Sequence, residues 1–167
     1  MRILAQQAAP ARPRSANMDV RTACSPHPSA MSQLPPKIEI GNVQVHLGDR
    51  QGKYPDGNQV IVRGTEARAA FDTPLVANRI GADFDAVDLV ILSHVHEDHM
   101  AGLHRVPDTP VWVHECDVDA ARSWPGLARH YGYDESTCEA LRLRIEAQFH
   151  YQPRPDALSY GDGAQWD

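Results

Sequence analysis

The feature that most constrains this chain is a short apolar segment that runs directly into a cluster of histidines. Residues 87–92 are almost all aliphatic, a pattern typical of a strand buried on both faces of a sheet. His94, His96 and His99 follow at once, and Asp98 lies among them. At a strand end the chain leaves the sheet and can fold around one point. The sequence therefore predicts a buried strand with a polar site at its end.

The side chains of this cluster are those that bind transition metals. His94 and His96 alternate along the chain and can direct their nitrogens the same way, whereas Asp98 and His99 lie on the following turn and can reach a second point. Nitrogen donors with one carboxylate suit zinc, with iron or manganese as alternatives. Two cations about 3.5–4 Å apart can share a water and lower its pKa towards 7. The pattern therefore indicates a metal centre for hydrolysis.

Alternating apolar and polar residues predict further strands around this one. Residues 37–47 read as two short strands with a turn at Gly41 and Asn42, and residues 48–58 read as a loop. The remaining strands are expected at 60–62, 69–71 and 111–113.

Two helices are expected from their end signals. Thr73 before Pro74 reads as an N-cap followed by proline at the first helical position, and Gly81 ends that helix. Residues 136–139 resemble a capping box that opens a second helix, and the residues after 149 read as loop. One face of this second helix is apolar and consists of Cys138, Leu141, Ile145 and Phe149.

The first 36 residues differ in composition from the rest. They are rich in proline, alanine and arginine and have no apolar periodicity, so we expect a disordered arm over 1–36 and a folded domain over 37–167. A secretory signal is not expected because the arm has no apolar core.

Composition excludes several partners. The net charge is −6, and the only lysines after residue 36 are Lys37 and Lys53, so we expect no nucleic-acid partner. No apolar run approaches the ~20 residues of a membrane span, so no membrane is expected either. Three cysteines without a disulfide or zinc pattern favour a reducing compartment, and we expect a cytoplasmic protein.

The segment 88–103 strongly resembles the His-x-His-x-Asp-His signature of the metallo-β-lactamase-fold hydrolases. The resemblance implies an α/β fold, an αββα sandwich, with zinc as cofactor, two ions in the complete site. It implies that His94 and His96 bind the first metal and that Asp98 and His99 bind the second. Asp98 would also act catalytically by orienting the attacking hydroxide. Asp72 looks like the strand-ending aspartate that supports the metal loop from behind, and residues 52–58 lie where relatives carry a substrate-facing hairpin.

The family completes its site with three downstream ligands, which are not visible here. These are a histidine in a Gly-His-Thr turn, a bridging aspartate and a final histidine. His150 lacks the glycine turn and is a weak candidate, and the same lack of a motif applies to His104, His114 and His130. We therefore expect the first half of the family's domain, truncated before that turn and inactive alone.

The resemblance implies a metal-dependent hydrolase that acts on a small-molecule substrate, namely an ester, lactone or thioester. The alternative is a non-catalytic fragment that binds metal weakly. A nuclease of the same superfamily is less favoured because the chain lacks a basic channel.

Overall fold

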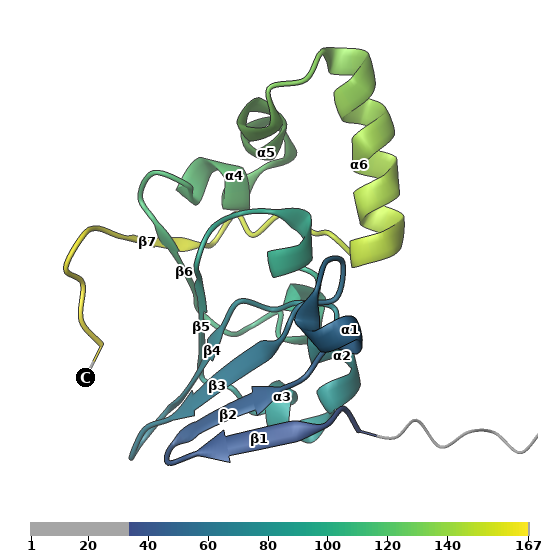
Figure 1. Cartoon of the computed structure of the whole chain (residues 1–167). Helices are drawn as coiled ribbons and strands as arrows, with labels where there is room; N and C mark the ends of the chain where they lie inside the picture. The colour runs from purple at the N-terminus through teal and green to yellow at the C-terminus, as the bar shows by residue number, and fades with distance from the viewer. Residues whose placement is uncertain (1–33, 167) are drawn as a thin grey trace, which may run out of the picture. The chain divides into compact units, whose positions relative to one another are not determined.

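The computed structural model describes residues 34–166, which contain one seven-stranded mixed sheet (Figure 1). The strands lie side by side in chain order. The pairs from β1 to β4 are antiparallel, and those from β4 to β7 are parallel. The strands are β1 Lys37–Ile40, β2 Val43–His46, β3 Gln59–Arg63, β4 Arg68–Phe71, β5 Leu89–Leu92, β6 Val111–His114 and β7 Leu158–Tyr160.

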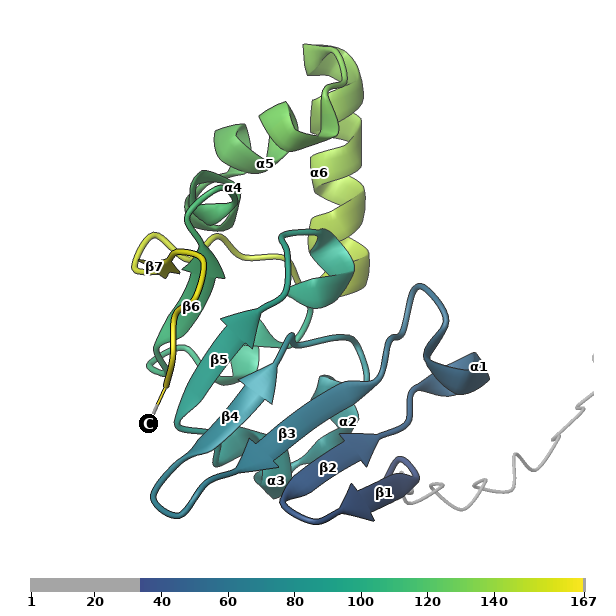
Figure 2. The same ribbon diagram turned by 60° about the vertical axis from the view of Figure 1, so that its left-hand side comes forward.

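Apart from α1, which lies between β2 and β3, the helices connect the parallel strands. From β4 to β7, each strand lies next to the preceding one, always on the same side of it. Right-handed crossovers therefore place these connections on the same face of the sheet. Figure 2 shows α2 and α3 behind the strands. The elements are α1 Asp49–Gly52, α2 Ala77–Ile80, α3 Ala82–Asp85, η1 Glu97–His99, η2 Leu103–Arg105, α4 Val118–Arg122, α5 Trp124–Tyr131 and α6 Glu135–Phe149.

The hydrophobic core lies between this face of the sheet and the helices. The strands contribute alternate residues, because side chains of a strand point to opposite faces. These strand residues and their helical partners include Ile61, Ala70, Val90, Leu92, Val111, Val113, Phe84, Leu127, Ile145 and Phe149. The opposite face is also apolar but less buried, and Phe71 there is 39% exposed. The described residues therefore form one helix layer and one sheet layer of the αββα arrangement.

Most of the strands expected from the sequence are confirmed. The hairpin over 37–47 turns at Gly41, whose positive φ of 59° suits a glycine, and residues 60–62, 69–71 and 111–113 lie in β3, β4 and β6. The strand expected over 87–92 is β5, with Val90, Ile91 and Leu92 buried.

The expected helix starts are wrong. Thr73 does not cap a helix: α2 begins at Ala77, and the Thr73 hydroxyl donates to the His99 carbonyl instead. Gly81 does end α2, with a φ of 71°. Helix α6 begins at Glu135 and is capped by Asp134, whose carboxylate accepts the amide N–H of Thr137, so the proposed capping box starts two residues too late.

Three further differences concern segments with weak periodicity. Cys138, Ile145 and Phe149 of α6 are buried as expected, but the residues after 149 include β7 and are not all loop. Helices α4 and α5 were not expected, because a helix of five and one of eight residues leave little periodic signal. Loop 48–58 contains α1, one irregular turn in which Arg50 and Gln51 have positive φ.

The expected arm over 1–36 lies outside the described residues except for its last three. The carbonyl of Pro36 accepts the amide N–H of Leu47 at 2.7 Å. Within residues 34–166, no helix combines the length and apolar character needed to cross a bilayer.

Candidate metal centre

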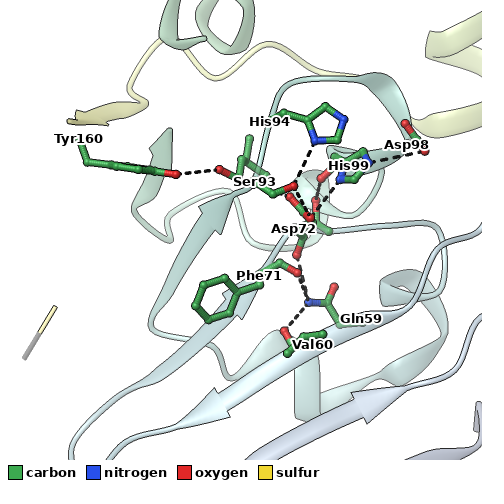
Figure 3. Close-up of polar contacts among 11 residues, drawn as sticks. Gln59, Val60, Phe71, Asp72, Ser93, His94, Asp98, His99 and Tyr160 are labelled. Carbon is green, nitrogen blue, oxygen red and sulfur yellow. Dashed lines mark hydrogen bonds and ion pairs between the residues drawn. The ribbon is translucent and has the colours of Figure 1, made fainter. Parts of the chain in front are cut away.

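The predicted site lies where two neighbouring parallel strands end. Asp72 follows β4, and Ser93 and His94 follow β5, which pairs in parallel with β4. The carboxyl ends of parallel strands meet at one edge of a sheet, which is where open α/β sheets bind ligands. Figure 3 shows the polar side chains gathered at this edge.

Asp72 is the centre of this group and has an unusual backbone. Its φ of 56° lies in the left-handed region, which aspartate tolerates better than most residues. The buried Gln59 side chain donates to the carbonyls of Phe71 and Asp72, at 3.2 and 3.0 Å. This turn directs the Asp72 carboxylate towards β5, where it accepts the amide N–H of Ser93 at 2.7 Å and the Ser93 hydroxyl at 2.8 Å.

The same carboxylate orients two of the predicted ligands (Figure 3). Its Oδ2 lies 3.0 Å from Nδ1 of His99, and the Ser93 hydroxyl that it holds lies 3.1 Å from Nδ1 of His94. Nδ1 of each ring thus lies beside an oxygen, which leaves Nε2 as the donor to a metal, an arrangement that metal-binding histidines commonly show. The predicted supporting role of Asp72 thus has a geometric basis.

The remaining ligand-type side chains are close to these two. The ring centroids of His94 and His99 are 3.9 Å apart, and those of His94 and His96 are 5.0 Å apart. Nε2 of His99 lies 3.8 Å from an Asp98 carboxylate oxygen. The structure therefore brings together all four residues that the sequence analysis selected.

The backbone of the motif is fixed from behind by the turn after β4. The His99 carbonyl accepts both the amide N–H and the hydroxyl of Thr73, at 2.9 and 3.0 Å. The amide N–H of Gly102 donates to the Thr73 carbonyl at 2.7 Å. A Cβ on Gly102 would lie 2.8 Å from the Cβ of Ala77, so the close approach requires glycine here.

The electrostatics of the two oriented rings differ. Burial lowers the pKa of His94, and the neighbouring rings of His99 and His96 lower it further, which favours the neutral ring that a metal requires. Burial alone would lower the pKa of His99, but the contact with Asp72 and the charges of Asp72 and Asp98 outweigh it and raise that pKa. The carboxylate thus makes His99 a more basic donor.

The donor set fits zinc, because three imidazoles and one carboxylate are its usual protein ligands. Across the described residues 34–166, no three His, Cys, Asp or Glu side chains are close enough to hold one ion. The pairing of His94 with His96, and of Asp98 with His99, stays a prediction.

The other histidines named in the sequence analysis lie away from the motif, with one exception. His150 lies beside His104, with ring centroids 4.8 Å apart, and Nε2 of His114 lies 3.3 Å from the Asp162 carboxylate. The ring of His130 is 5.8 Å from that of His96. His130 is therefore the additional histidine that the fold brings next to the motif.

Two tyrosines border the site, and only the loop that contains one of them was expected there. Tyr54, from loop 48–58, and Tyr131, at the end of α5, both donate hydrogen bonds to Glu97. Burial and the contact with Glu97 raise the pKa of Tyr131, so its hydroxyl stays protonated. A shallow pocket of about 290 Å³ is lined by Tyr54, His94, His96, Glu97, Asp98, His99 and Tyr131. The sequence pointed to the loop that contains Tyr54. No sequence signal pointed to Tyr131, which is distant from the motif along the chain.

Comparison with known protein families now identifies the class of the protein. Residues 63–158 match the metallo-beta-lactamase superfamily, and this match covers more than half of the chain. The chain therefore belongs to that superfamily, as its motif indicates. No curated protein sequence matches the chain significantly.

A solved metallo-beta-lactamase structure agrees with this fold. The native FEZ-1 metallo-beta-lactamase from Legionella gormanii superposes with a TM-score of 0.56 and 18% identity, over 80% of this chain and 49% of that one. MEM-A1, a subclass B3 metallo-beta-lactamase isolated from a soil metagenome library, gives a TM-score of 0.49 at 17% identity, over 80% and 49% of the two chains. The hydrolase AbOPH of the beta-lactamase superfamily gives 0.49 at 16% identity, over 78% and 62%. The present chain thus spans about half the length of the metallo-beta-lactamases that it resembles.

Proposed function

We propose that the protein is a metal-dependent hydrolase that acts on a small ester, lactone or thioester. His94 and His96 would hold one zinc ion, and Asp98 and His99 would hold a second. Iron or manganese would suit the same donors. The superfamily is shown by comparison, whereas the metals and the substrate are proposed from the residues at the site.

The observation that carries the proposal is the network around Asp72. One carboxylate supports His99 directly and His94 through Ser93, so both rings are held with the same nitrogen free. Oriented imidazoles at a strand end have no evident role in folding, because the turn is already fixed by Thr73. The network therefore favours a role in binding a metal.

Bound zinc would polarise a carbonyl oxygen and generate a hydroxide nucleophile near neutral pH. The protein's own contribution is to position these groups. Asp98 carries a carboxylate that can accept a hydrogen bond from the attacking water and so orient it. Asp72 keeps the ligand rings in place, and Tyr54 and Tyr131 line the pocket beside them.

The net charge of the chain and the volume of the pocket favour a particular class of substrate. The chain carries a net charge of −6, which disfavours a nucleic-acid polyanion, and a pocket of about 290 Å³ suits a small molecule. A nuclease would need a basic channel along which to bind its substrate.

The test is a panel of small esters, lactones and thioesters assayed with zinc- or manganese-loaded protein. Four donors supply two protein ligands to each ion, and catalytic zinc usually has three. We therefore expect turnover only from a protein in which further ligands complete the coordination of each ion. The His96→Ala variant of that protein should lose this turnover. Turnover that persists in His96→Ala would contradict the proposal. A chain that takes up zinc through these residues without turnover matches the non-catalytic alternative.

A further inference from the structure

Glu97 connects three segments that are distant in the sequence. It lies within the metal-binding motif, and its Oε1 accepts a hydrogen bond from the Tyr54 hydroxyl at 3.1 Å. Its Oε2 accepts a hydrogen bond from the Tyr131 hydroxyl. One carboxylate therefore joins the motif to loop 48–58 and to the end of α5.

The two tyrosine rings that it holds form walls of the pocket over the motif. The Tyr131 ring stacks on the imidazole of His96, with centroids 5.6 Å apart and planes 13° apart. The Tyr54 ring packs against Phe149 of α6, with centroids 6.0 Å apart. Both rings line the pocket that also contains His94 and His99.

A carboxylate is the side chain that this position requires. The two hydroxyls donate to different oxygens, and an ionised glutamate offers two acceptor oxygens and no donor. Glutamine would offer one oxygen and an NH₂ group, so one of the two tyrosines would have to change its role from donor to acceptor. The arrangement thus depends on the charge of Glu97 and not only on its size.

We propose that Glu97 is a positioning residue: its carboxylate fixes Tyr54 and Tyr131 as the two walls of the substrate pocket, and through Tyr131 it holds the ring of His96. Both hydroxyls already donate to Glu97, so the two walls offer a substrate mainly the apolar atoms of their rings. They would therefore accept the apolar part of a small ester, lactone or thioester. The reference to substrate rests on the proposed function, whereas the connection between the three segments does not.

The connection is tested by hydrogen–deuterium exchange on the metal-free full chain. We expect Tyr54→Phe to raise amide exchange over residues 48–58 roughly three- to tenfold, the effect of losing one hydrogen bond. Tyr131→Phe should raise exchange at the end of α5 by a similar factor, and Glu97→Gln should raise it in at least one of the two segments. The matched control is Tyr133→Phe, because Tyr133 is exposed, stacks on Tyr131 and has no hydroxyl hydrogen bond within the described residues.

A second readout measures the effect on His96. Cobalt(II) titration, followed by the visible absorption of the bound ion, should show roughly three- to tenfold weaker binding in Tyr131→Phe and Glu97→Gln than in Tyr133→Phe. Should Glu97→Gln fail to fold, the comparison of Tyr54→Phe and Tyr131→Phe with Tyr133→Phe decides the question.

The two proposals fail in different ways. Exchange in Tyr54→Phe and Tyr131→Phe that equals exchange in Tyr133→Phe would overturn the role of Glu97, whatever the metal does. Altered exchange with cobalt affinity equal to that of Tyr133→Phe would overturn the link to His96. Absence of cobalt binding in the unaltered chain would instead overturn the proposed function and, with it, the assignment of the rings as substrate walls.

Discussion

The Asp72 carboxylate lies 3.0 Å from Nδ1 of His99 and reaches His94 through the hydroxyl of Ser93. Two ligand rings therefore depend on one side chain. Replacing Asp72 with Asn keeps its size but removes the charge, so we expect the affinity for zinc or cobalt to fall about 10- to 100-fold. Asp88→Asn is the matched control. Asp88 also accepts a backbone amide N–H, that of Arg68, but it lies at the opposite end of β5 from the site. Equal affinities of the two variants, measured by calorimetry, would contradict the role of Asp72.

The base of loop 48–58 depends on Arg79 of α2. Its guanidinium donates to Asp49 at 2.8 Å and to Asp56, whose side chain is 9% exposed. Arg79→Met would leave the buried Asp56 carboxylate with fewer partners, so we expect the free energy of unfolding to fall by about 1–3 kcal/mol. Urea denaturation would measure this loss. Arg144→Met, on the exposed surface of α6, should change it by less than about 0.5 kcal/mol. A similar loss in both variants would show that Asp56 does not need Arg79.

His46 gives the chain a predicted dependence of stability on pH. It is buried in β2, and burial lowers its pKa below the ordinary value of 6.5. The unfolded chain then binds a proton that the folded chain does not, as the pH falls below about 6.5. Stability is therefore complete above that pH and decreases below it, by at most about 1.4 kcal/mol per pH unit for this group. The charged groups whose fields act on His46 are Asp83, Lys37, Arg63 and Glu39.

Thermal unfolding between pH 5 and pH 8 tests this expectation. His46→Leu removes the titrating ring from the same buried position and should flatten the decrease in stability. His130→Gln, which alters an exposed histidine, should leave the decrease as it is in the unaltered chain. A decrease that is identical in all three proteins would assign the pH dependence to other groups.

The features of this protein that could be predicted from its sequence are those encoded by neighbouring residues. The strands and the motif were predictable because period-two alternation and a dense cluster of ligand residues are both short-range patterns. The start of α2 was not, because the signal at Thr73 and Pro74 resembles a helix cap, while the Thr73 hydroxyl is used by the His99 carbonyl across the fold. Tertiary contacts thus override a local preference at the site itself.

The same distinction holds for the candidate site. Asp72 was expected from the resemblance to the family, but its connection to His94 depends on Ser93 and on a left-handed turn for which the sequence has no clear signal. Tyr131 reaches the motif only because α5 packs beside it, a relationship between distant segments. The residues within the motif could thus be proposed from the sequence, whereas those that the fold brings to it could not.

The central claim is that the residues after β5 bind a metal ion, and zinc uptake by the full chain tests it most directly. Metal analysis and calorimetry should show zinc binding by the unaltered chain and none by His94→Ala/His96→Ala, which lacks both donors to the first ion. The double variant His104→Ala/His150→Ala removes another neighbouring histidine pair and should keep the binding. Zinc binding that survives loss of His94 and His96, or that disappears with His104 and His150, would contradict the account.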